Sequence, residues 1–131
     1  MKKAITHTYN DDGTATVNAF VRVLLYRDGR HFIAQSLEVD YCSAGLTLEE
    51  AKESFARGFT ETIKVHLAVY GSAEKMLKRQ APPEFFSAYY GEQMSQDAEP
   101  LELPVSHAAG VPRWLQFMQG GGMRHCEAAT G

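Results

Sequence analysis

The chain has 131 residues, with 44% hydrophobic and 22% charged residues, which suits one globular domain with a single core. Its formal net charge is -3, whereas nucleic-acid-binding domains usually carry a strongly basic face. The composition therefore argues against nucleic-acid binding, and two cysteines are too few for a disulfide scaffold.

The sequence predicts a cytoplasmic protein without a membrane partner. No apolar run approaches the roughly 20 residues that a membrane span needs. Lys2 and Lys3 are not followed by the apolar segment of a signal peptide. We therefore expect Cys42 and Cys126 to be reduced thiols.

The first part of the chain predicts β-strands. Residues 4–9 alternate in β-forming residues, and 10–13 are a strong turn signal. Residues 14–26 form a β-rich run that is long for one strand, so we expect a bend or bulge near residues 18–20. The face expected to meet the core carries Val17, Ala19, Val21, Val23 and Leu25. The opposite face is mixed, and its large apolar members, expected at a partner surface, are Phe20, Leu24 and Tyr26.

A tight turn at Asp28-Gly29 predicts a hairpin, because Gly29 can adopt the positive φ that a two-residue turn requires. The second strand follows the turn, and Glu38-Val39-Asp40 forms a corner. A short third strand then ends at Gly45. Together with the run at 14–26, which comes after the strand at 4–9, these features predict three consecutive strands directly before the first helix.

A long amphipathic helix is the clearest local signal. Thr47 and Glu50 form a capping box, Leu46 and Ala51 stand where a hydrophobic staple forms, and Gly71 is a natural C′ residue. Its predicted apolar face consists of Leu48, Ala51, Phe55, Phe59, Ile63, Leu67 and Tyr70. A helix of this length can cover one face of a small sheet.

The remaining sequence predicts an insert at 72–100 and a C-terminal arm. The insert contains a short helix starting near Ser72 and an aromatic helical turn at 84–91. Residues 101–105 alternate as an edge strand, and 111–118 read as a short helix or arm before a disordered end. We therefore expect an α+β domain over 1–106, with a small antiparallel sheet in β-β-β-α-β order and one long helix on one face. A partly disordered arm at 107–131 would follow it.

The block from Phe32 to Leu67 resembles the HicB-like antitoxin family. The residues that carry the resemblance are Phe32-Ile33-Ala34-Gln35-Ser36-Leu37-Glu38, Asp40, Ala44-Gly45, Thr47 and Glu49-Glu50-Ala51, with the helix through Ile63 and Leu67. The strand at 101–105 is similar to the family's last strand, so the resemblance covers around half of the chain.

The resemblance implies a trimmed ribonuclease-H-like fold that lacks the catalytic carboxylates. It also implies neutralisation of a small HicA-like ribonuclease toxin. Many members carry a C-terminal DNA-binding module, but residues 107–131 are too short and too rich in glycine for one. In those members the module represses the operon that encodes them. This departure, and the insert at 72–100, argue against that role for this chain.

Reactive residues supply an alternative, a small enzyme. The sheet could bring His31 and Cys42 together with His66 nearby, as a metal site or a Cys/His nucleophile pair. Glu38 and Asp40 are the only close carboxylates at a strand end, whereas two-metal nucleases need several acids. None of these sets has the spacing or context of a known site, so we expect no cofactor, metal ion or catalytic residue.

A nucleic-acid-binding alternative would depend on basic side chains that the acidic balance opposes. They are Lys75, Lys78, Arg79 and Arg113. Aromatic residues make up 11% of the chain and favour an interface instead. We expect a non-catalytic, self-associating protein-interaction module whose interface contains Phe20, Tyr26, Phe85, Tyr89, Leu103 and Trp114.

Overall fold

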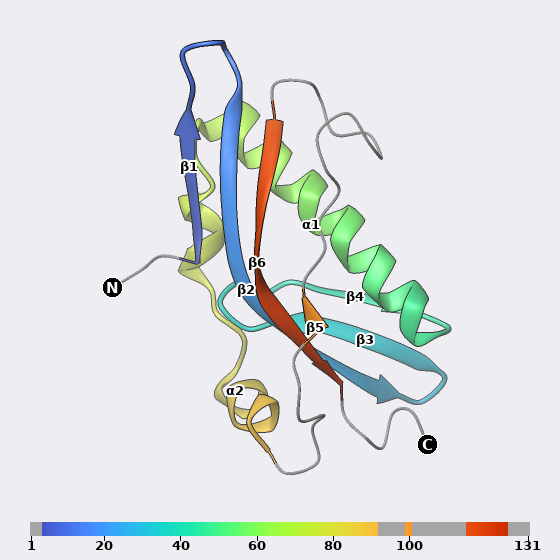
Figure 1. Ribbon diagram of the computed structural model, residues 1–131. Helices are drawn as coiled ribbons and strands as arrows, with labels where there is room; N and C mark the ends of the chain where they lie inside the picture. The colour runs from blue at the N-terminus through green and yellow to red at the C-terminus, as the bar shows by residue number, and fades with distance from the viewer. Residues whose placement is uncertain (1–3, 92–98, 101–114, 126–131) are drawn as a thin grey trace.

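The computed structural model describes residues 4–91, 99–100 and 115–125. In it, a curled sheet packs against one long helix, so the expected α+β class is confirmed (Figure 1). The strands are β1 (Ile5–Tyr9), β2 (Ala15–Asp28), β3 (His31–Ser36), β4 (Cys42–Gly45), β5 (Glu99–Pro100) and β6 (Leu115–His125). The helices are α1 (Leu48–Tyr70), the 3-10 helix η1 (Glu74–Lys78) and α2 (Pro83–Tyr89).

β2 is the central strand of the sheet, whose order is β4-β3-β2-β6-β5 with β1 also on β2. β1 pairs antiparallel with residues 15–19 of β2, and β3 pairs antiparallel with residues 23–28. β6 pairs parallel with residues 15–25, which corrects the expectation of a wholly antiparallel sheet. β1 and β3 therefore follow one another along the other edge of β2. β2 curves along its length (Figure 1). Its register with β6 is unbroken, so the expected bulge is absent from that edge.

The C-terminal strand corrects the sequence-based expectation. Residues 111–118 were expected to form a short helix or arm and the residues after them to be disordered, but Leu115–His125 is a β-strand. Its pairing with β2 explains the difference, because hydrogen bonds to a formed neighbouring strand outweigh the weak β-propensity of Gly120, Gly121 and Gly122. The strand expected at 101–105 lies outside the described residues.

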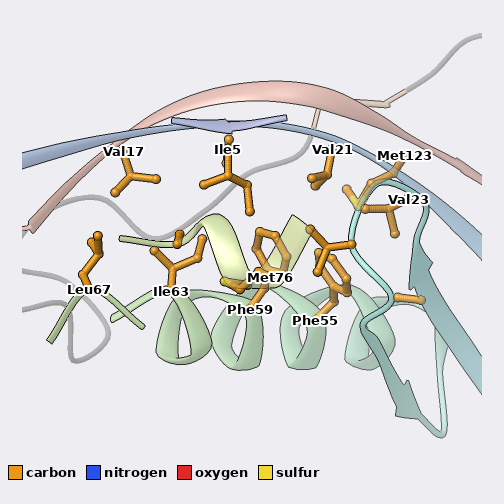
Figure 2. Packing of buried hydrophobic residues seen from close by; sticks show 14 of the residues in the cluster. Ile5, Val17, Val21, Val23, Phe55, Phe59, Ile63, Leu67, Met76 and Met123 are labelled. Atoms are coloured by element: carbon orange, nitrogen blue, oxygen red, sulfur yellow. The ribbon is translucent and has the colours of Figure 1, made fainter. Parts of the chain in front are cut away.

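The main core lies between the sheet and α1. The predicted core face of β2 is confirmed, since Val17, Ala19, Val21, Val23 and Leu25 are fully buried. Figure 2 shows strand residues such as Ile5 and Val21 facing helix residues such as Phe59 and Ile63 across this layer. Met76, from η1, belongs to the same cluster. α1 therefore covers the odd-numbered face of β2, as its apolar stripe predicts.

The ends of α1 agree with the predicted caps in most details. The Thr47 hydroxyl accepts a hydrogen bond from the Glu50 amide at 3.1 Å, and Gly71 has a φ of 70°. The Glu50 carboxylate accepts from the Leu46 amide at 2.8 Å instead of from that of Thr47. Leu46 is 64% exposed, so it provides little of the expected staple. The helix is thus fixed at its start by hydrogen bonds more than by apolar contact.

Two glycines permit close approaches around α1. A Cβ at Gly45 would lie 2.5 Å from the Ala51 amide nitrogen, so a side chain there would force β4 away from the start of α1. A Cβ at Gly58 would overlap the hydroxyl group of Tyr41. The Tyr41 ring lies 5.4 Å from that of Phe55 and 5.8 Å from that of Phe59. Gly58 therefore makes room for a tyrosine that closes the side of the core.

α2 covers part of the opposite face of the sheet. Leu24, Leu37, Ala81 and Tyr89 form a second buried cluster there, with Tyr26, Phe85 and Phe86 packed against it. The connecting chain is hydrogen-bonded to the strand corner, where the Ala81 amide donates to Leu37 at 2.9 Å and the Asp40 amide donates to Arg79 at 2.7 Å. The aromatic turn expected at 84–91 is thus a helix on the sheet.

Candidate protein-docking surface

Both carboxylates considered for metal chemistry take part in ion pairs. Glu38 accepts from the Arg22 backbone amide at 2.7 Å and from its Nε at 2.6 Å. Asp40 accepts from the Gln35 side chain at 3.1 Å and lies 3.8 Å from the Arg79 guanidinium. These contacts hold the corner between β3 and β4 to its neighbours, which gives the two acids a structural role.

The proposed grouping of His31, Cys42 and His66 is not found. Cys42 pairs with Gln35, while His31 begins β3 opposite Asp28. Four strand positions separate Gln35 from His31, which is about 13 Å at roughly 3.3 Å per residue. Among the described residues, no group of three or more histidine, cysteine or acidic side chains could hold a metal ion. The sheet therefore separates His31 from Cys42.

Arg22 ties α2 to the sheet. Its guanidinium lies 5.4 Å from the Phe86 ring centre and 5.5 Å from that of Tyr90, and it donates a hydrogen bond to the Tyr90 hydroxyl. Burial alone would lower the pKa of Arg22, but the hydrogen bonds to Glu38 and Tyr90 raise it above its ordinary value. Arg22 is therefore a permanent cation under a set of aromatic rings.

The residues predicted for an interface have different environments. Tyr89 is buried in the α2 cluster, and Tyr26 and Phe85 are half-buried with their ring centres 5.9 Å apart. Leu24, which was also expected on a partner surface, is buried under α2, so that expectation was wrong. Phe20 is 37% exposed. Leu103 and Trp114 lie outside the described residues.

Exposed apolar side chains occur instead on the last turns of α1 and at the end of β1, which the Tyr9 hydrogen bond to Gly71 joins. The set comprises Tyr9, Val65, Val69 and Tyr70, which are 51–65% exposed, and we call it the α1-end patch. Tyr70 was expected in the core, and its 51% exposure corrects that. The patch is more than half of the large hydrophobic side chains that are exposed in the described residues. Val65 and Val69 lie on the side of α1 away from the core, whereas Tyr9 belongs to β1 on the sheet side, so the set surrounds this end of the helix. Exposed apolar side chains that lie close to one another are a feature of docking surfaces.

Polar contacts hold the α1-end patch in place. The Tyr9 hydroxyl donates to the Gly71 carbonyl at 2.8 Å, which joins the end of β1 to the end of α1. Lys75 Nζ lies 3.8 Å from the Tyr70 ring centre, and the rings of His66 and Tyr70 are 5.3 Å apart. The aromatic side chains are thus presented in fixed positions, which lowers the entropic cost of binding.

The distribution of charged residues along α1 contains a sequence signal for this patch. The first turns of α1 alternate acids and bases up to Lys64, but from Val65 to Ala73 there is no aspartate, glutamate, lysine or arginine. The outward positions Val65 and Val69 are apolar although they lie opposite the core stripe. A solvated helix face usually carries charged or polar residues throughout.

Comparison of the chain with protein-family models, with curated proteins and with solved structures gives no significant match. None of the helices in the described residues is long and apolar enough to cross a lipid bilayer.

Proposed function

We propose that this chain is a cytoplasmic, non-catalytic protein-interaction module that associates with copies of itself. The α1-end patch is the observation that carries the proposal, because it exposes two aromatic and two aliphatic side chains on a rigid part of the fold. Such residues are enriched where proteins bind one another. The ion pairs of Glu38 and Asp40 fit the same view, since they give these acids a structural task.

We further propose that the module acts as a HicB-type antitoxin towards a HicA-like ribonuclease. The residues that resemble this family support the proposal, because several of them have a specific local role. Gly45 allows the close approach to Ala51, and Thr47 and Glu50 cap the long helix. These local roles explain the diffuse pattern of small and capping residues that carries the resemblance.

Self-association can be tested by light scattering of the purified chain. A mass that rises with concentration towards a dimer or larger oligomer is the expected result. A monodisperse monomer up to near-millimolar concentration would contradict self-association.

The antitoxin role needs a separate experiment. The chain would be co-expressed with a small basic protein encoded by the adjacent reading frame, and cell growth and messenger-RNA decay would be measured. Growth arrest by that protein alone, relieved by co-expression, is expected. Arrest that persists despite equal expression of both proteins would contradict the antitoxin proposal and leave self-association standing.

A further inference from the structure

We infer that α2 is a hinged cover on the second face of the sheet, which opens as a unit while the core between the sheet and α1 stays folded. This inference is independent of the α1-end patch and goes beyond the proposed self-association. It assigns a conformational role to part of the segment that the sequence predicted only as an insert.

The cluster under α2 is physically separate from the main core. Its buried members are Leu24, Leu37, Ala81 and Tyr89, and none of them belongs to the cluster that packs against α1. The sheet lies between the two clusters, because neighbouring residues of β2 such as Leu24 and Leu25 point to opposite faces. In Figure 1, α2 accordingly lies apart from α1. Detaching α2 therefore uncovers the second face and leaves the main core in place.

α2 depends on this docking for its helical structure. It spans only seven residues, Pro83–Tyr89, and among the described residues no side chain caps its start. Helices shorter than about 12–15 residues are marginally stable alone in water. Detachment of α2 from the sheet should therefore also unfold its helix, which couples exposure of the second cluster to hydrogen exchange of the helix amides.

The chain directly before α2 provides a hinge. The Ala81 amide donates to the Leu37 carbonyl at 2.9 Å, and the Arg79 carbonyl accepts from the Asp40 amide at 2.7 Å. The chain is thus fixed to the strand corner as far as Ala81. Pro82 follows with an extended backbone, φ -53° and ψ 149°, and has no amide hydrogen with which to continue these contacts. The hinge between the fixed segment and α2 therefore lies at Pro82.

Arg22 provides a latch at the far end of α2. Its guanidinium lies 5.4 Å from the centre of the Phe86 ring and donates a hydrogen bond to the hydroxyl group of Tyr90, the residue that follows the helix. Arg22 itself belongs to β2, and its Nε lies 2.6 Å from the Glu38 carboxylate. The latch thus joins a stationary group on the sheet to two residues that move with α2.

Opening of the cover changes the apolar surface that the sheet presents. With α2 detached, Leu24, Leu37 and the Tyr26 ring lose the cover that Phe85 and Tyr89 provide. Burial of these side chains drives closure, and the Arg22 contacts add to it at the end of the helix. The latch therefore determines how much apolar surface this face of the sheet exposes to solvent.

Hydrogen exchange of the folded full chain in low concentrations of urea tests the cover. The reporters are the amides of residues 87–89 in α2, compared with those of residues 59–63 in α1. We expect the α2 amides to share one opening reaction with an intermediate urea dependence, because opening exposes the second cluster but not the main core. An opening without urea dependence, which indicates fraying of single residues, would overturn the inference. A urea dependence equal to that of α1, which indicates opening only with the whole molecule, would overturn it too.

Tyr90→Phe tests the latch, because it keeps the ring and removes the hydroxyl that accepts the Arg22 hydrogen bond. Exchange of the α2 amides should become about threefold to tenfold faster, while that of the α1 amides stays unchanged. Tyr9→Phe is the matched control, since it removes the hydroxyl that donates to the Gly71 carbonyl, away from α2. It should leave α2 exchange at the wild-type rate. Exchange of α2 that ignores Tyr90→Phe, or that is equally fast in Tyr9→Phe, overturns the latch.

Discussion

Replacing Gly58 with alanine tests how α1 is packed against Tyr41, the residue that directly precedes β4. In a solvated helix, glycine to alanine stabilises by about 1 kcal/mol. Here the new Cβ would overlap the Tyr41 hydroxyl, so the tyrosine must move off the rings of Phe55 and Phe59. Overpacking of this kind typically costs about 1–3 kcal/mol. We expect Gly58→Ala to lower the free energy of unfolding by about 1–2 kcal/mol.

Removing the Tyr41 hydroxyl should reverse the sign of the effect that Gly58→Ala has on stability. In Tyr41→Phe the hydroxyl is gone, and the nearest remaining ring atom, Cζ, is 3.2 Å from the position that the alanine methyl group would take. Gly58→Ala in that background should be neutral or stabilising by up to about 1 kcal/mol. Urea unfolding of the two single variants and the double variant gives the coupling energy. Stabilisation by Gly58→Ala in the wild-type background, or additive effects, would refute this description of the contact.

The remaining predictions concern the strand corner, the helix start and the tyrosines. Glu38→Gln should lower the free energy of unfolding by about 1–3 kcal/mol, because the half-buried Arg22 loses its charged partner. As a control, Lys64→Gln, which breaks the exposed pair with Glu61, should change the free energy of unfolding by less than about 0.5 kcal/mol. Urea unfolding of both variants checks these values. Gly45→Ala should cost about 1–3 kcal/mol, because the new methyl group meets helix backbone that cannot rotate away, and an unchanged thermal midpoint would contradict the close approach. Burial raises the pKa of Tyr26 and Tyr41 above 10.0. The stability that these two groups contribute should therefore be fully present below pH 10 and be lost at higher pH, because the unfolded chain releases those protons first. Tyrosinate absorbance should then show groups titrating above the ordinary range, and Tyr41→Phe should remove one of them.

Local patterns were sufficient for the hairpin, the core face of β2 and the capped helix, although the two turn residues are Gly29 and Arg30 and not the expected Asp28 and Gly29, because Asp28 still pairs with His31. Each depends on neighbours in sequence: the alternation from Val17 to Leu25, the turn at Gly29, and the hydrogen bond between Thr47 and Glu50. Such features need no distant partner, so they can be predicted from the sequence.

The errors arose where distant segments decide the outcome. β6 contains Gly120–Gly122 and looks weak alone, but it pairs with β2 over eleven residues. Leu24 looked exposed because α2, which covers it, comes some sixty residues later. Tertiary contacts override local preference in both cases.

Part of the candidate surface could have been found from the sequence. The buried residues of α1 step by four from Ala51 to Leu67, so the next core position falls on Gly71 and leaves Tyr70 to one side. The absence of charged residues from Val65 to Ala73 is a second clue. The contribution of Tyr9 could not be predicted, because it depends on β1 reaching the end of α1.

Hydrogen–deuterium exchange of the wild-type chain at increasing concentration tests the docking surface most directly. Amides near the C-terminal end of α1, from about Val65 to Lys75, should exchange more slowly as the copies associate, while those near Leu48 should keep their rates. Association without any added protection around Val69, or protection confined to another surface, would contradict the central claim.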